Sequence, residues 1–361
     1  MTPKQRIDAL LTDQTPDRVP WLPELNDGFI RKVVQQRGPA PEGVDDQTFV
    51  NQVIGADQLA RLKAVRERWR NVEVIEDAQA LTTTYVTPKG RLVHRRQPDE
   101  TAQTQYTVGH LIAGPESFEP YKALIEDPEY TPDYDQAQAV IDRVGQTGLA
   151  TIDAPATPLM HLIMWDMGIE PTLMGLFDYP DEMADLMDLI HKRNKEYYRI
   201  AAAGPGRVVR PMEDTSSKLT SPAMYAEYAV DHLKDYADIC HEHGKVFIVH
   251  MCGHLRDMLD VIAHVPLDGI EAITPPPTGD ADLSEIRRRL GDIFLLGGVD
   301  PTTYTTLEAR ELRVRVADLL ERMKGDQRLI LGHEEIPVTA KLDNVLAVSE
   351  LIEQTRDGFY D

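Results

Sequence analysis

Short apolar runs alternate with longer segments of helical periodicity through the second half of the chain. Most of the runs carry consecutive apolar residues, which is typical of parallel strands that are buried on both faces. The runs lie at 148–155, 207–214, 245–253, 269–276, 293–300 and 328–335, and the helical patterns at 180–203, 222–243, 254–264, 282–290, 307–323 and 341–356. This repeated strand–helix order predicts a parallel sheet that is covered by helices.

The helical pattern at 222–243 is bounded at both ends by residues suited to helix termini. Ser221 is a favourable N-cap, Pro222 suits the first helical position, and Gly244 is a common residue beyond a helix end. A further strand is predicted at 18–25, whereas the pattern reveals no clear eighth strand. Together these elements predict an α/β protein with a (β/α)8 TIM-barrel fold.

Residues 81–95 follow a different pattern, with two β-rich arms around Pro88-Lys89-Gly90. Such an arrangement indicates a β-hairpin. We therefore expect a small N-terminal β-hairpin or meander as an addition to the barrel, in a β-rich insertion at about 72–110. No repeat or Gly/Ser-rich linker divides the chain, so we predict a single TIM-barrel domain over 1–361.

Composition narrows the possible partners. Lys and Arg number 38 against 60 Asp and Glu, which gives a net charge of −22. An acidic surface repels nucleic-acid phosphates and anionic lipids, so we expect no nucleic-acid partner and no membrane partner. The two cysteines form no disulfide framework, and the chain shows no secretory signal and no apolar run of membrane-spanning length. We expect a cytoplasmic protein.

Polar residues gather where the predicted strands end. A single polar residue at a strand end needs no functional explanation, because every strand must end in something polar. The gathering of carboxylates, imidazoles and a thiol on one rim is harder to explain in this way, and barrel active sites lie on that rim. The residues concerned are Asp153, Glu213, Asp214, His250, Cys252, Glu271, Asp300, His333, Glu334 and Glu335.

The segment His250-Met251-Cys252-Gly253 is the most informative part of this rim. Residues two apart on a strand project to the same side, so His250 and Cys252 can direct an imidazole and a thiolate at one point. These ligands suit zinc, and a catalytic zinc needs a third protein ligand and an open fourth position. The plainer interpretation is a buried cysteine beside a hydrogen-bonded histidine, and the pattern alone leaves both open.

The other sulfur-containing residues are interpreted mainly as core. Cys240 lies at the spacing of a buried stripe on the helix 222–243, so we assign it to packing. Methionines at roughly helical spacing, among them Met160, surround Trp165. They are expected to belong to the core, with an apolar lid over a large flat ligand as the less common alternative.

Several longer segments, spread over nearly the whole chain, each combine a recognisable motif with a predicted helix or strand. The opening KQRIDALLTDQTPDRVPW has the form of a short helix, a turn and a first barrel strand. The segment SPAMYAEYAVDHLKDYADICHEHGKVFIVHMCG is a helix followed by a strand that ends in His-x-Cys-Gly, GDIFLLGGVDP is a Gly-Gly-x-Asp strand, and EIPVTAKLDNVLA ends the pattern with Asn344 at the usual place. These segments resemble the uroporphyrinogen decarboxylase superfamily, and YVTPKGRLVHR resembles the hairpin of its methyltransferase branch.

Two branches of this superfamily differ at the predicted site. The decarboxylases carry an Arg-Gln-Ala-Gly-Arg segment after the first strand, where this chain has PWLPELNDGF. The corrinoid-linked methyltransferases carry zinc on His-x-Cys, matched by His250 and Cys252, and on a third ligand that is often Cys in Gly-Cys-x-Ile-Pro. Here the sequence is His333-Glu334-Glu335-Ile336-Pro337. The resemblance implies Glu334 as the third ligand, with His333 as the alternative.

The resemblance implies a zinc-dependent methyltransferase. It would transfer a methyl group between a small-molecule donor or acceptor and a corrinoid, either free cobalamin or the cofactor of a corrinoid protein. Glu334 in place of Cys makes the metal harder and favours an oxygen-bearing substrate such as a methoxy compound. The alternatives are a decarboxylase like the other branch and a metal-binding or corrinoid-binding barrel without catalysis.

Specific roles are expected for the rim residues in this enzyme. Glu213 and Asp214 are expected to exchange a proton with the substrate or to orient the zinc ligands. The remaining candidates are expected to line the cleft for substrate and cofactor. They are Asp153, Met160, Trp165, Glu271 and Asp300.

Overall fold

The computed structural model describes residues 1–99 and 104–361, and its central feature is one curled sheet of eight parallel strands. Along the sheet the strands follow the order β1-β14-β13-β12-β11-β10-β9-β2. They are β1 (Trp21–Leu25), β2 (Gln58–Leu62), β9 (Gly148–Ala154), β10 (Val208–Glu213), β11 (Val246–Met251), β12 (Gly269–Ile273), β13 (Phe294–Gly297) and β14 (Leu329–Ile336). The Asp57 amide donates a hydrogen bond of 2.8 Å to the Trp21 carbonyl, which joins the two end strands. The TIM-barrel-like α/β fold predicted from the sequence is thereby confirmed.

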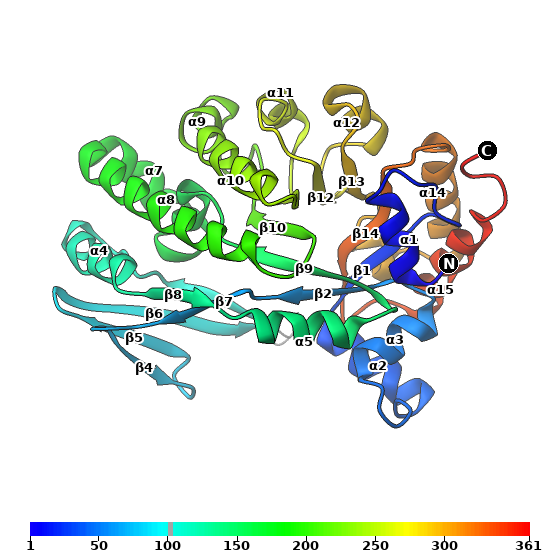
Figure 1. Cartoon of the computed structure of the whole chain (residues 1–361), viewed down its shortest axis with the longest axis horizontal. Helices are drawn as coiled ribbons and strands as arrows, with labels where there is room; N and C mark the ends of the chain where they lie inside the picture. Colours follow the sequence, from blue (N-terminus) through cyan, green and yellow to red (C-terminus); the bar gives the residue numbers. More distant parts are fainter. Residues whose placement is uncertain (100–103) are drawn as a thin grey trace.

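Helices lie around this sheet, at its lower end and against a smaller sheet described below (Figure 1). On the N-terminal half they are α1 (Pro3–Leu10), α2 (Asp27–Arg37), α3 (Asp46–Ile54), α4 (Phe118–Glu126), α5 (Tyr134–Val144), α6 (Pro158–His161), a π-helical turn (Leu162–Asp166), α7 (Ile169–Asp178) and α8 (Pro180–Ala203). The later helices are α9 (Pro222–Tyr228), α10 (Val230–Glu242), α11 (Leu259–Ile262), α12 (Leu283–Leu290), α13 (Thr303–Thr306), α14 (Ala309–Arg322) and α15 (Leu342–Gln354).

The prediction of one continuous helix at 222–243 is wrong. The backbone of Ala229, at φ −127° and ψ −38°, interrupts the segment and separates α9 from α10. Ser221 nevertheless caps α9 as expected, because its side chain accepts a hydrogen bond from the Met224 amide. The end signals were therefore interpreted correctly, whereas the local backbone conformation at Ala229 was not visible in the pattern.

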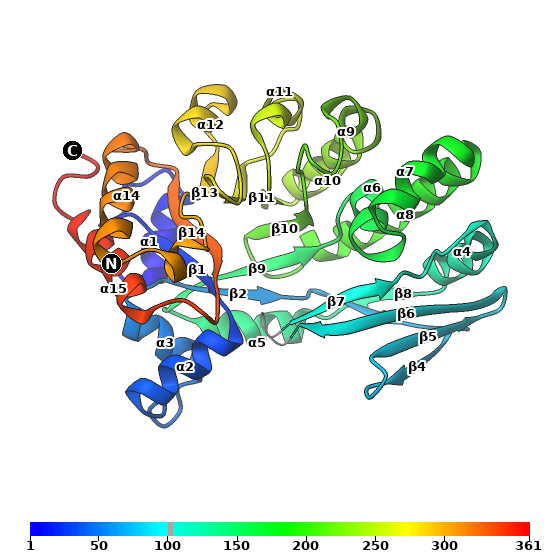
Figure 2. The same cartoon turned by 180° about the vertical axis from the view of Figure 1, so that it is seen from behind.

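A second sheet, antiparallel and in the order β4-β5-β6-β7, lies within the range in which a β-rich insertion is expected. Its strands are β4 (Glu73–Asp77), β5 (Thr82–Thr87), β6 (Gly90–Asp99) and β7 (Thr104–Gly109). Figures 1 and 2 show this sheet projecting from the barrel on the side away from α14 and α15. A further short antiparallel pair is formed by β3 (Val65–Arg68) and β8 (Glu129–Pro132).

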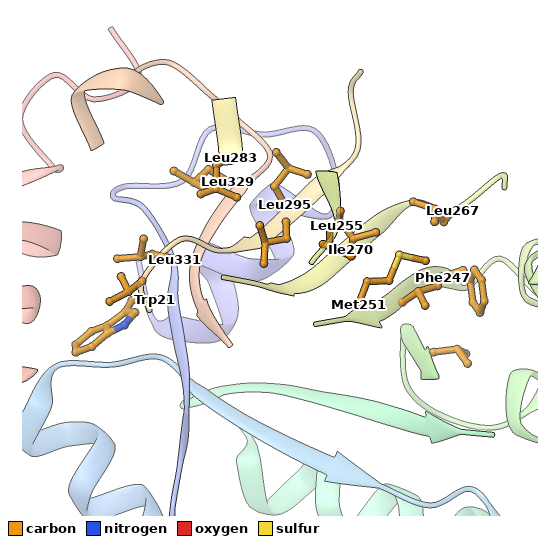
Figure 3. Close-up of a cluster of buried hydrophobic side chains, with 14 of the residues drawn as sticks. Trp21, Phe247, Met251, Leu255, Leu267, Ile270, Leu283, Leu295, Leu329 and Leu331 are labelled. Carbon is orange, nitrogen blue, oxygen red and sulfur yellow. The ribbon is translucent and has the colours of Figure 1, made fainter. Parts of the chain in front are cut away.

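The barrel strands divide their side chains between two apolar layers. Trp21, Phe247, Ile270 and Leu331 face the surrounding helices in the main core, part of which appears in Figure 3. A second layer fills the lower barrel interior against α1, and its strand residues include Leu22, Val208, Ile248, Phe294 and Ile330. Because successive strand residues alternate between these layers, the residues two positions after the second set along each strand point into the barrel above that layer.

Charged side chains are also buried at the other end of the barrel. At the N-terminal end of the strands, the buried carboxylate of Asp57 is contacted by the guanidinium groups of Arg6 and Arg18.

Among the described residues, no helix combines the length and apolar character needed to cross a membrane.

Candidate functional site: a pocket at the strand ends

A pocket of about 460 Å³ opens at the carboxyl ends of the barrel strands. Its lining includes the carboxylates of Glu24, Asp214 and Glu335, the imidazoles of His250 and His254, and the thiol of Cys252. Carboxyl ends of parallel strands are where barrel enzymes place their reacting groups. The pocket therefore brings together several of the residues that the sequence analysis selected.

His250 and Cys252 lie on one wall of this pocket, as their spacing on the strand predicts. His250 follows Ile248 by two residues on β11, so its imidazole continues the row of inward-facing side chains. Gly253 turns the chain beyond them at φ +91°, and a Cβ atom there would lie 2.7 Å from the Ser216 Cβ. Glycine is thus required for the turn that ends the His-x-Cys segment.

The Cys252 thiol is hydrogen-bonded to the carboxylate of Asp214 from the neighbouring strand end. Burial and the nearby Asp214 charge raise the pKa of Cys252 to about 12. Burial raises the pKa of Asp214 as well, although the hydrogen bond from Cys252 and the proximity of His250 oppose this shift. In these surroundings a thiolate becomes favourable only when a cation compensates its charge.

Glu271 lies below the pocket rather than on its wall. Its carboxylate is 1% exposed and accepts a hydrogen bond of 2.7 Å from the Arg210 guanidinium. The same oxygen, Oε1, lies 3.0 Å from Nδ1 of His250. The predicted cleft residue is therefore a buried partner of the predicted metal ligand.

Glu213 faces the opposite side of the sheet from the pocket. It is fully buried and accepts hydrogen bonds from the Thr157 amide at 2.9 Å, the Thr157 hydroxyl at 2.6 Å and the Tyr225 hydroxyl at 3.2 Å. Burial raises the pKa of Glu213 to about 7, although these hydrogen bonds act in the opposite direction. Glu213 links the starts of α6 and α9 to the sheet and is not part of the pocket lining.

The two other predicted acids, Asp153 and Asp300, each contact a neighbouring residue close to the pocket without lining it. The Asp153 carboxylate lies 3.8 Å from the Arg210 guanidinium, and burial raises its pKa. Asp300 is 2% exposed and accepts hydrogen bonds from the backbone amides of Thr278 and Thr302 at 2.8 and 2.9 Å. Thr278 lines the pocket, so Asp300 supports the pocket wall from behind.

Met160 and Trp165 lie in the segment that follows β9. Met160 is fully buried in the main core, as the core interpretation of the methionines expects. Trp165 lies in the π-helical turn, is partly buried against the same core, and makes an edge contact with His161 at 5.2 Å between ring centroids. Neither side chain belongs to the pocket lining.

The prediction for the third metal ligand falls partly outside the described structure. The backbone of His333 and Glu334 belongs to β14, but their side chains are outside the described part of the chain. Glu335, two residues beyond His333, pairs with Glu24 on β1 and lines the pocket. Among the described residues, no group of three or more His, Cys, Asp or Glu side chains is arranged to hold a metal ion. Glu334, with His333 as the alternative, therefore stays a prediction.

Several pocket residues were not selected from the sequence. His254 directly follows the His-x-Cys-Gly segment, and Ser216 and Lys218 follow the end of β10 by a few residues. Glu24, on β1, forms an ion pair of 2.6 Å with Arg61 on β2. Position just beyond a strand end is the one signal that could have identified the first three.

The family to which the chain belongs follows from comparison with known proteins. The model of the uroporphyrinogen decarboxylase (URO-D) family matches residues 120–355. The chain belongs to this family. The predicted superfamily is therefore confirmed, and the matched region includes Asp214, His250 and Cys252.

Comparison with solved structures found a match that extends over the whole of this chain. A methyltransferase from Methanosarcina mazei superposes with a TM-score of 0.65 at 16% identity, with 100% of each chain covered. A GH5-4 broad specificity endoglucanase from an uncultured bacterium reaches a TM-score of only 0.43 at 10% identity, with 93% of this chain and 94% of that chain covered. No curated protein matches the chain. At 16% identity, the likeness to the methyltransferase is one of fold alone.

Proposed function

We propose that this protein is a zinc-dependent methyltransferase that transfers a methyl group between a small molecule and a corrinoid. The observation that carries the proposal is the placement of His250 and Cys252 on one wall of the strand-end pocket. Membership of the uroporphyrinogen decarboxylase family and the shared fold with an archaeal methyltransferase support it.

The residues present suit a zinc ion in their chemistry. An imidazole and a thiol that line one pocket are borderline-soft ligands of the type that zinc binds, and the Asp214 carboxylate accepts a hydrogen bond from the thiol of the metal-free protein. We propose that His250 and Cys252 hold the ion with Glu334, or alternatively His333, as the third ligand. When bound, zinc would act as a Lewis acid on the heteroatom that gains or loses the methyl group.

The two adjacent acids receive different roles in this proposal. Asp214 lines the pocket, so it is the carboxylate that can exchange a proton with a bound substrate. Glu213 is buried on the other side of the sheet, where it accepts hydrogen bonds from the N-cap residue of α6, Thr157, and from Tyr225 of α9. The pair predicted from the sequence is thus divided into one reacting group and one supporting group.

The pocket is suited to a small substrate. A volume of about 460 Å³ is within the usual range for small-molecule sites. A corrinoid is much larger, so we propose that it covers the mouth of the pocket and does not enter it. We retain a methoxy compound as the preferred substrate class, because a carboxylate ligand favours an oxygen donor.

Charge around the pocket argues against the decarboxylase alternative. Its described lining contains the carboxylates of Glu24, Asp214 and Glu335 and one lysine, Lys218. A polyacidic substrate would need clustered basic groups to compensate its charges. This environment supports methyl transfer over decarboxylation of a polyacid.

Metal content and methyl transfer test the proposal together. Purified protein should contain zinc, and His250→Ala, Cys252→Ala and Glu334→Ala should each lose most of it, whereas His333→Ala and the matched control Cys240→Ala should retain it. Wild-type protein should exchange a methyl group between methylcobalamin and a small acceptor, and the change in corrinoid absorbance measures this transfer. Zinc or cobalamin binding without any methyl transfer would instead support a non-catalytic barrel, and retention of zinc in the His250 and Cys252 variants would refute the metal site.

A further inference from the structure

We propose that Glu271, held in place by Arg210, is a positioning residue that determines which imidazole nitrogen of His250 is directed at the metal. This inference rests on the proposed function, because it assigns His250 as a metal ligand. It adds two residues that neither line the pocket nor belong to the expected ligand set.

The three side chains lie on neighbouring strands inside the barrel. His250 on β11 is directly opposite Glu271 on β12 and Met212 on β10. Arg210 precedes Met212 by two residues, so it also points inward, one step deeper in the barrel. Arg210 and Glu271 are 2% and 1% exposed, which places both charged groups out of contact with solvent.

The carboxylate of Glu271 decides the tautomer of His250 through simple donor and acceptor rules. An ionised carboxylate only accepts hydrogen bonds, so Nδ1 of His250, 3.0 Å from Glu271 Oε1, must carry the hydrogen. The lone pair of a neutral imidazole is then on Nε2. A metal-binding histidine uses the nitrogen that carries the lone pair, so Glu271 selects Nε2 as the ligand atom.

Arg210 accounts for the presence of a carboxylate at this depth. Its guanidinium donates to Glu271 Oε1 at 2.7 Å and lies 3.8 Å from Asp153 on its other side. A buried carboxylate without a cationic partner is strongly destabilising, whereas an Arg–carboxylate pair is held in a defined geometry. Arg210 therefore keeps the Glu271 oxygen at the position where His250 needs an acceptor.

The backbone at this point of β12 departs from regular strand geometry. Ala272, which follows Glu271 and lines the pocket, has a φ of +61°. The pairing of β12 with β13 also shifts register between Ile270 and Ile273. Irregularities of this kind change the direction of side chains next to functional sites. They also strain the backbone, and a residue that serves only in packing does not need such strain.

Zinc affinity of Glu271→Gln tests the inference. The amide keeps the shape of the side chain but also brings a donor to the imidazole, so the tautomer is no longer determined. We expect affinity for zinc alone, measured by competition with a chelator, to fall by about 10- to 100-fold. The visible absorption of the cobalt(II)-substituted protein should change with it, because the ligand geometry is altered. A purely structural carboxylate would leave both measurements unchanged in protein that remains folded.

The control is Asp235→Asn, which alters a comparable carboxylate–imidazole pair of 2.9 Å with His191 on the outer helices. It should keep the wild-type affinity and cobalt spectrum. If Glu271→Gln does not fold, the double variant Glu271→Gln/Arg210→Met replaces it in the test, because this variant removes both buried charges. Its affinity for zinc should be lowered by the same 10- to 100-fold, about the range expected for Glu271→Gln. Wild-type affinity in whichever of these variants folds overturns the inference.

The outcome for His250→Ala separates this inference from the proposed function. Loss of zinc in His250→Ala with full affinity in Glu271→Gln means that the metal site is correct and the positioning role is wrong. Retention of zinc in His250→Ala means that the metal site itself is wrong, and the positioning role is then overturned with it.

Discussion

The two ends of the barrel both bury charged side chains, but they use them differently. At the N-terminal end, Asp57 is fully buried between Arg6 and Arg18 and also accepts a hydrogen bond of 3.0 Å from the Trp21 amide. At the C-terminal end, Asp214 and Cys252 share a hydrogen bond on the wall of an open pocket. The charges of the first set are compensated within the protein, whereas the Asp214 carboxylate and the Cys252 thiol face space that a ligand can occupy.

The segments joined at each end explain this difference. The network around Asp57 connects the first helix, the start of β1 and the segment before β2, and the neighbouring Val19 amide donates to Thr355 beyond α15 at 3.0 Å. It therefore closes the barrel between its first and last elements. The pocket end instead collects strand ends whose side chains converge on one point, and that is the arrangement required for chemistry.

The largest expected effect concerns Asp57. Asp57→Ala leaves Arg6 and Arg18 without their buried carboxylate, so the free energy of unfolding should fall by about 3–5 kcal/mol. Chemical denaturation followed by circular dichroism measures this loss. Protein that remains folded should bind zinc as the wild type does. A loss below about 1 kcal/mol, the level of an exposed pair, would show that the two ends do not differ as described.

The next effect concerns Glu213 and pH. Because burial raises its pKa to about 7 in the folded protein, the folded state holds the proton more tightly than the unfolded state, where the pKa is about 4.3. Its stabilising contribution is therefore complete below about pH 4.3 and is lost as the pH rises through 7, by on the order of 3 kcal/mol. Denaturation of wild type and Glu213→Gln across this range should show that the difference between their free energies of unfolding changes by this amount, and parallel curves would contradict the prediction.

A smaller effect separates the two cysteines. Cys240 is fully buried in the helix-facing core and burial raises its pKa to about 12, so it is a packing residue. Cys240→Ala should lower the free energy of unfolding by about 1 kcal/mol, the typical cost of a single substitution, and leave zinc content unchanged. Cys252→Ala should show the reverse, with little change in the stability of the metal-free protein. Equal zinc loss in both variants would indicate an indirect effect of stability.

The smallest effect concerns the ion pair at the pocket rim. Arg61 and Glu24 are 2.6 Å apart, but their side chains are 36% and 30% exposed. Arg61→Ala should therefore change the free energy of unfolding by only about 0.2–1 kcal/mol, despite a geometry as good as that of the buried network. Thermal unfolding of Arg61→Ala and Asp57→Ala side by side measures the contrast, which should widen when salt is added, because salt screens the exposed pair more than the buried network. A loss as large as that of Asp57→Ala would show that burial is not the deciding variable.

Much of the barrel could be predicted from residues alone, but one strand could not. The runs at 245–253 and 328–335 are apolar on both faces, so they indicate strands without ambiguity. β2, with the sequence Gln58-Leu59-Ala60-Arg61-Leu62, was missed because it is short and carries polar side chains. Gln58 is 3% exposed and Arg61 pairs with Glu24, so both are satisfied by residues that are close only in the folded chain.

The sequence by itself was enough to expect His250 and Cys252 at one pocket, because the two-residue period of a strand is a local property, and both residues line the pocket at the strand ends. It could not separate Glu213 from Asp214, since the assignment of each to the helix side or the pocket side depends on how the strand end meets its neighbours. Nor could it connect Glu271 and Arg210 with His250. Those contacts depend on the register of β10, β11 and β12, and register is set by the packing of the whole sheet.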